Sequence, residues 1–62
     1  MEPLLLTVPE VQAALAMGRS SIYEMMALGE LPVVRIGRSV RVPARAVREY
    51  AERLEAEAAV IA

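Results

Sequence analysis

The chain lacks several residue types on which most enzymes and metal sites depend. Its 62 residues include no Cys, His, Asp, Asn, Lys, Phe or Trp. Without Cys and His, disulfides and the usual zinc ligands are excluded. Nucleophile–base pairs draw mainly on the same missing types. We therefore expect a protein that is not an enzyme and that needs neither a cofactor nor a metal.

Long apolar runs and targeting features are also missing. No run reaches the roughly 18 apolar residues of a membrane-spanning helix. The first six residues contain an acidic residue and no basic one, which does not fit a signal peptide. These features favour a cytoplasmic protein with no membrane partner. At this length, with 56% apolar residues, we expect one small domain over residues 1–62.

The charge is unevenly distributed along the chain. A net charge of -1 argues at first against nucleic-acid binding. Five of the seven arginines, however, lie between Arg35 and Arg48 with no acidic residue among them, whereas four glutamates and one arginine follow from Glu49 onward. A nearly neutral protein can still present a face of one sign. The alternative is an ordinary solvated run of surface charge.

A capping box predicts the start of a first helix. Thr7 can accept a hydrogen bond from the backbone N–H three residues on, and Glu10 can reach back to the N–H of Thr7. The apolar spacing that follows predicts about two turns of amphipathic helix. We expect this helix to end near Met17 and Gly18, because glycine permits a left-handed turn. Its inward residues would be Val8, Val11 and Leu15.

A second helix is predicted between Arg19 and Gly29. Serines near its start favour a helix N-terminus because they can bond free backbone N–H groups. Two short helices joined by a tight turn fit a helix-turn-helix whose second helix contacts DNA, although an ordinary helical hairpin has the same spacing. The inward stripe would be Ile22, Met25 and Met26, with Ser20, Tyr23, Glu24 and Ala27 on the exposed side.

Two β-branched runs, 33–36 and 40–42, predict a hairpin. A two-residue turn would pair Arg35 with Val40 and mix charged with apolar residues. A three-residue loop would pair Arg35 with Arg41 and keep each face uniform, so we predict this longer loop. Like charges that face each other across a ladder are destabilising. A DNA phosphate would relieve them, which makes the hairpin a candidate DNA contact.

Pro43 marks the predicted start of a third helix, because proline fits a first helical turn. The predicted fold class is mainly α with a small β-hairpin, in the order helix, helix, hairpin, helix, which is a single winged helix-turn-helix domain. The inward residues of the third helix would be Val47, Tyr50, Leu54 and Ile61.

Five short stretches together resemble one known family. They are LTVPEV at 6–11, RSSIY at 19–23, GELP at 29–32, VRIGR at 34–38 and RVP at 41–43. In order and spacing they resemble the excisionase-type, MerR-like winged helix-turn-helix domains of bacterial integrative elements, phages and small regulators. The resemblance covers about residues 4–54. In combination, these stretches are quite specific.

The resemblance implies that the second helix enters the major groove and that the wing reaches the neighbouring backbone. Gly18 departs from the pattern, because the family commonly has a capping serine there, and Glu24 is an acid on the exposed helix face. The implied DNA contacts are Arg19, Ser20, Ser21 and Tyr23 on the second helix, Arg35, Arg38, Ser39 and Arg41 on the wing, and Thr7 at the start of the first helix.

These features together predict a sequence-specific protein that binds double-stranded DNA. The first hypothesis is an excisionase, or recombination directionality factor, that bends attachment-site DNA, associates with itself cooperatively on DNA and assists a tyrosine integrase. A small transcriptional regulator would use the same surface, so the sequence does not separate the two. A protein-interaction module that never touches DNA is the alternative from another class.

Overall fold

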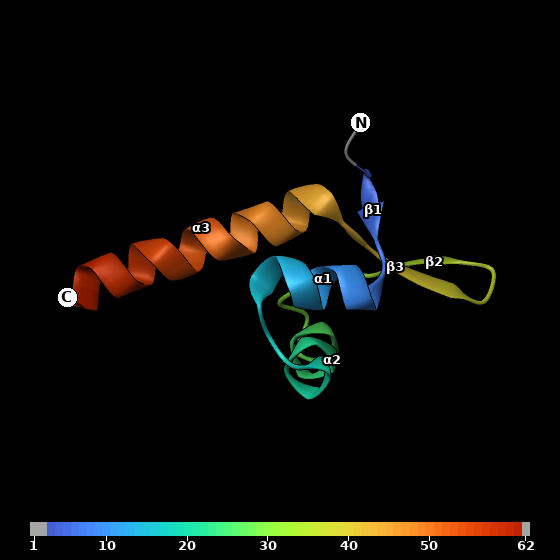
Figure 1. The fold of residues 1–62 in the computed structure, drawn as a ribbon, viewed down its shortest axis with the longest axis horizontal. Helices are drawn as coiled ribbons and strands as arrows, with labels where there is room; N and C mark the ends of the chain where they lie inside the picture. Colours follow the sequence, from blue (N-terminus) through green and yellow to red (C-terminus); the bar gives the residue numbers. More distant parts are fainter. Residues whose placement is uncertain (1–2, 62) are drawn as a thin grey trace.

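The computed structural model describes residues 3–61, with side chains described as far as residue 59. The first two residues and the last residue of the predicted 1–62 domain lie outside this description. The first two belong to the segment that was predicted not to be a signal peptide. The side chain of Ile61, which was predicted to point inward, also lies outside it. The fold confirms a mainly α domain with a small sheet (Figure 1). Its elements are β1 (Leu5–Leu6), α1 (Val8–Leu15), α2 (Arg19–Ala27), β2 (Val34–Ile36), β3 (Ser39–Pro43) and α3 (Ala44–Ile61).

The first helix begins with the predicted capping box. The Glu10 N–H donates to Thr7 Oγ1 over 3.3 Å, and the Thr7 N–H donates to Glu10 Oε1 over 2.9 Å. The predicted helix end is wrong in detail. Ala16, with φ 54° and ψ 45°, takes the left-handed conformation, whereas Gly18 is extended at φ -73°. The left-handed residue comes earlier because Gly18 is the N-cap of α2 and must already be extended.

The second helix begins and ends at glycines. Gly18 is its N-cap and makes no side-chain cap hydrogen bond, so the serines lie inside the first turn rather than capping it. At the other end, Gly29 has φ 78°. The Glu30 N–H donates to the Met25 carbonyl over 2.9 Å, and the Gly29 N–H donates to the Met26 carbonyl over 3.2 Å. These two bonds form a Schellman motif, which confirms the predicted end.

The hairpin forms as predicted, but its register is not the predicted one. Ile36 pairs with Ser39, Arg35 with Val40 and Val34 with Arg41, so the turn has only two residues. Gly37 occupies the first turn position with φ 61° and permits this tight connection. Residues opposite each other share a face, so Arg35 and Arg41 lie on opposite faces. The predicted arginine pair is therefore absent.

The sheet has a third strand that was not predicted from the sequence. Leu5 pairs with Pro43 and Leu6 with Val42, which makes β3 the central strand in the order β1-β3-β2. The Ala44 N–H also donates to the Leu4 carbonyl over 2.9 Å. Pro43 is the last residue of β3, and α3 starts at the next residue. The segment from Leu4 to Leu6 is thus hydrogen-bonded along the end of β3 and to the first residue of α3.

The core lies between α1, α2, the central strand and the start of α3. Tyr50 packs against its margin, whereas Leu54 is 38% exposed, so the predicted inward stripe of α3 ends at Tyr50. The rest of α3 extends away from the body (Figure 1). The buried residues of the core cluster are Val8, Val11, Ile22, Met25, Leu31, Val42 and Val47.

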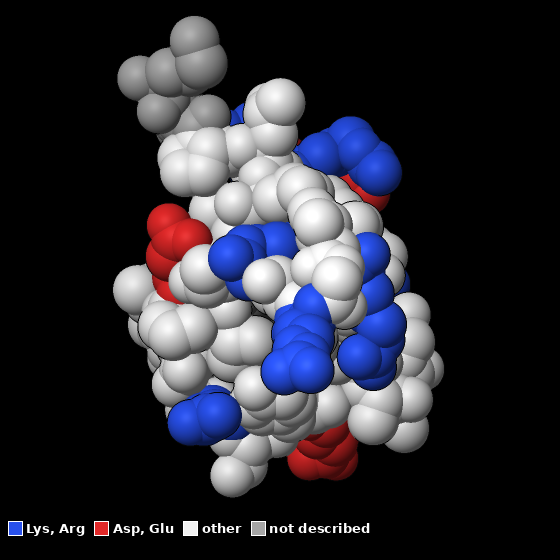
Figure 2. Space-filling model, turned by 90° about the vertical axis from the view of Figure 1, so that its right-hand side faces the viewer, with Lys and Arg blue, Asp and Glu red and all other residues white. Residues whose placement is uncertain are grey.

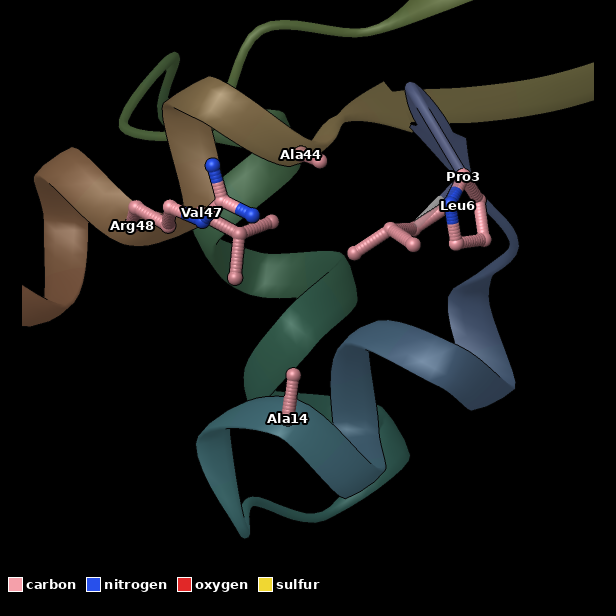
Figure 3. Close-up of a pocket in the computed structure, with 6 residues that line it drawn as sticks. All are labelled: Pro3, Leu6, Ala14, Ala44, Val47 and Arg48. Carbon is pink, nitrogen blue, oxygen red and sulfur yellow. The ribbon is translucent and has the colours of Figure 1, made fainter. Parts of the chain in front are cut away.

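A shallow apolar hollow borders this core. It lies between β1, α1 and the first turns of α3, and Leu6 and Val47 point toward each other across it (Figure 3). Its described lining residues are Pro3, Leu6, Ala14, Ala44, Val47 and Arg48. No helix among residues 3–61 has the length and apolar content needed to cross a membrane.

Candidate nucleic-acid interface

The exposed face of α2 carries the predicted helix contacts together. Arg19 is the first helical residue, and its guanidinium carbon lies 5.4 Å from the centre of the Tyr23 ring. This cation–π contact holds the arginine along the helix surface. Ser20 and Ser21 are exposed in the same first turn. Because Gly18 provides no side-chain cap, the first N–H groups of α2 are available to an anion.

The wing carries one predicted arginine at its tip and places another near α2. Arg38 is the second residue of the hairpin turn and is exposed, with Ser39 next to it. Arg35 shares a face with Val33 and Val40, and these three residues line a groove whose opposite wall is Tyr23, Met26 and Ala27 of α2. The shorter turn therefore directs Arg35 toward the second helix.

Arg41 lies on the other face of the sheet. It is half-buried, and its Nη1 donates to the Val40 carbonyl over 2.9 Å. Continuing the β1–β3 register by one residue sets it across from Thr7. The positive charge of Arg41 contributes to a lowered pKa of the Glu10 carboxyl, although the hydrogen bonds from the Thr7 backbone and side chain are the larger causes. Arg41 is thus near the start of α1.

Thr7 is engaged within the chain. Its hydroxyl donates to Glu10 Oε1 over 3.0 Å and accepts from the Glu10 N–H. The predicted contact residues therefore fall into two groups. One group comprises the α2 residues and Arg35, and the other comprises Thr7, Arg41 and Ser39, because Ser39 shares the sheet face of Arg41. Arg38 lies between the two groups at the hairpin turn.

The arginines give this end of the molecule a positive surface. Figure 2 looks onto the end where the wing projects, and several arginine side chains lie across the middle of the view while glutamates appear toward its edges. The groove's apolar residues Met26, Ala27, Val33 and Val40 were not among the predicted contacts. The exposed i, i+4 pair of Tyr23 and Ala27 was the sequence signal that could have identified this wall.

The other polar contacts belong to α3 and its surroundings. Arg45 and Glu49 form an exposed ion pair of 3.0 Å, and the Tyr50 hydroxyl donates to Glu30 over 3.4 Å. Arg53 lies 4.9 Å from the centre of the Tyr50 ring. In the described part of the chain, no group of three or more His, Cys, Asp or Glu residues could hold a metal ion. These contacts support α3 rather than a reactive centre.

Comparison with known proteins decides the family. A model described as a helix-turn-helix domain matches residues 5–55. A Saccharopolyspora erythraea protein provisionally named an excisionase is 46% identical over 54 residues, which cover 87% of this chain and 55% of that protein. An excisionase of Streptomyces ambofaciens is 46% identical over 48 residues, 77% of each chain. The chain belongs to the excisionase-type helix-turn-helix family.

A third relative of this helix-turn-helix chain comes from Mycobacterium tuberculosis. It is provisionally named as a DNA-binding protein and is 48% identical over 48 residues, 77% of this chain and 62% of the relative. The chain thus spans just over half to under two thirds of the length of the first relatives. No solved structure matches the chain significantly.

Proposed function

We propose that this protein is a DNA-binding excisionase and not an enzyme. It binds double-stranded attachment-site DNA in the cytoplasm of a bacterium, bends it and assists a tyrosine integrase in excising a mobile element. Residues 1–62 act in this proposal as one winged helix-turn-helix unit. The observation that carries it is the groove that places Arg35 of the wing opposite the exposed Tyr23 and Ala27 of α2.

In this proposal α2 enters the major groove. Arg19, Ser20, Ser21 and Tyr23 then meet base edges and phosphates, and the free N–H groups of the first turn bind a phosphate. Glu24 is exposed on the same helix. It either accepts from a cytosine amino group or faces away from the phosphates.

The wing binds the backbone beside that groove. Arg38 at the turn and Ser39 beside it meet the DNA phosphates or the minor groove. Arg35 faces the DNA strand that would pass along the groove between the wing and α2. Arg41 and Thr7 lie on the other sheet face, so we propose them as flanking contacts at the start of α1. Each arginine that neutralises a phosphate releases counterions and makes binding depend on salt.

Self-association and the integrase would use α3. The outer half of this helix projects from the body and carries exposed Leu54 with Glu52, Glu55 and Glu57 around it. This half is available to a neighbouring copy or to the integrase while α2 and the wing are on DNA. A single recognition helix covers few base pairs, so useful specificity needs several copies.

The first test is a salt titration of binding to attachment-site DNA. We expect log affinity to fall steeply with log salt for the wild type. For Arg38→Ala we expect a slope shallower by about one unit, because one phosphate contact is lost. Arg53→Ala removes the same charge from α3 beside Tyr50 and should leave the slope unchanged. Absent or salt-independent binding would contradict the proposal and favour a protein partner.

A second test separates excision from gene regulation. Repeated attachment sites should be bound cooperatively and migrate as bent DNA, and excision by the neighbouring integrase should require this protein. DNA binding without any effect on excision would instead support the small transcriptional regulator.

A further inference from the structure

The exposed face of α2 is poor in the side chains that recognise most bases. Arg and Lys recognise guanine, Asn and Gln recognise adenine, and acidic residues recognise cytosine. The chain has no Lys, Asn or Asp, and its one glutamine, Gln12, lies half-buried on α1. On α2 the charged side chains are Arg19, which lies over the Tyr23 ring, and Glu24. The hydroxyls of Ser20 and Ser21 can bond to bases of either kind and so discriminate little. Hydrogen bonds can therefore specify few positions from this helix.

The same face carries an apolar strip. Tyr23 is 43% exposed, and Ala27 follows it one turn later and is also exposed. Residues at i and i+4 are neighbours on a helix surface. Tyr23 and Ala27, which we call the Tyr23–Ala27 strip, form with Met26 the α2 wall of the groove that faces Val33 and Val40.

The charges around the strip indicate what covers it. Arg19 lies against Tyr23 at one end, and Arg35 is the charged residue among the described residues that line the groove. An apolar ligand that fits here must therefore come attached to anionic groups. DNA meets both requirements, because thymine displays a methyl group in the major groove between two phosphate backbones.

We propose that the Tyr23–Ala27 strip recognises thymine through its C5 methyl group, with Arg35 holding the phosphate across the groove. This inference rests on the proposed function, since it assumes that α2 occupies the major groove. The protein would then prefer sites with thymines at positions that face the strip.

Replacement of thymine by deoxyuridine tests this directly, because it removes the methyl group and leaves every hydrogen-bonding group in place. The bound site is first located by footprinting, and each thymine is then replaced in turn. We expect affinity to fall about fourfold at each thymine that the strip contacts, the value of one buried methyl group.

Two variants locate the effect on the protein. Ala27→Ser places a hydroxyl on the strip and should bring the affinity ratio between thymine and deoxyuridine sites close to one. Leu28→Ser changes a side chain that is 67% exposed next to the strip and should leave the ratio at the wild-type value. Arg35→Ala should weaken both duplexes by the same factor, because phosphate binding does not depend on the methyl group.

Failure of the thymine inference and failure of DNA binding give different results in these experiments. Equal wild-type affinities for thymine and deoxyuridine sites, with salt-dependent binding retained, would overturn the methyl inference and leave DNA binding intact. No binding to any duplex would instead overturn DNA binding itself. If Ala27→Ser does not fold by circular dichroism, the wild-type comparison still decides the question.

Discussion

Ala16 occupies a backbone conformation that L-residues with a side chain rarely adopt. Its φ of 54° lies in the left-handed region, where the Cβ atom approaches the following carbonyl oxygen. Ala16 and Met17 both donate their N–H groups to the Gln12 carbonyl, with 3.1 Å for Met17. These two bonds close α1 and hold Ala16 in place, at a conformational cost of roughly 1–2 kcal/mol.

Ala16→Gly should therefore stabilise the protein. Glycine removes the Cβ strain but adds backbone freedom to the unfolded chain, so we expect a net gain of up to about 1 kcal/mol. Urea unfolding measures the free energy. The matched control is Ala13→Gly, an exposed position inside α1, which should lose about 1 kcal/mol. A loss at both positions would contradict the account of Ala16.

The arginines also differ at the residue scale. Sequence spacing treated Arg35 and Arg41 as equivalent wing contacts, yet Arg35 lines the groove against α2 and Arg41 is half-buried toward Thr7. The reason is the period of two in a strand, where a register shift of one residue moves a side chain to the other face. The roles of Arg35 and Arg41 on DNA stay predictions, but the structure shows that the two side chains have different surroundings.

At the scale of elements, the hairpin turn decides where the wing residues point. The turn has two residues, with a positive φ at Gly37, a combination that suits the right-handed twist of paired strands. Uniform faces would have required a longer loop, which is the register predicted from the sequence. Only one end of the hairpin face that carries Val42 is buried. Val42 is fully buried there, whereas Val40 and Arg35 lie on the same face toward the edge of the body, so this face does not have to be apolar along its whole length.

Gly37→Ala should destabilise this element. A Cβ atom at Gly37 would meet no other atom within 4 Å, so the expected cost of about 1–2 kcal/mol comes from its φ of 61° alone. Gly18→Ala is the control, because its Cβ also has open space and its φ is -73°. There the weaker N-cap and the stiffer unfolded chain oppose each other, and we expect about 0.5 kcal/mol or less. Equal costs by thermal unfolding would contradict the turn geometry.

The helices were more predictable than the strands. Thr7 with Glu10, and Gly29, are local signals whose hydrogen-bond partners lie within a few residues, so they identified the start of α1 and the end of α2 correctly. Strand β1 has two residues and no alternation to detect, and its partners Val42 and Pro43 are distant in sequence. Such pairing leaves almost no mark on the local pattern.

At the scale of the whole molecule, a small core supports a long terminal helix. The fully buried large side chains are Ile22, Leu31, Val11 and Val42, drawn from α1, the α2 region and the central strand. Helix α3 contributes Ala46 and Val47 to the buried set and then leaves the body. A 62-residue domain buries little surface overall, so its stability depends on these few residues.

Substitutions in the core and in the projecting half of α3 should differ sharply in their effect on the free energy of unfolding. Ile22→Ala removes a fully buried side chain and should cost about 2–5 kcal/mol, enough to unfold a domain of this size. Leu54→Ala acts on the projecting half of α3 and should change the free energy of unfolding by about 0.5 kcal/mol or less. Chemical unfolding followed by circular dichroism compares them. A comparable loss for Leu54→Ala would mean that α3 packs beyond Tyr50.

The sequence by itself determined the order of the three helices and the hairpin, the capping of α1, the end of α2 and the concentration of arginine around the wing. These depend on residues close in the chain, where hydrogen bonding and periodicity act directly. Only the tertiary structure decided the strand register, the pairing of β1, the separation of Arg35 from Arg41 and the groove beside Tyr23. Those features depend on contacts between distant segments, whose relative positions are set by burial of Val42 and Ile22 in a shared core.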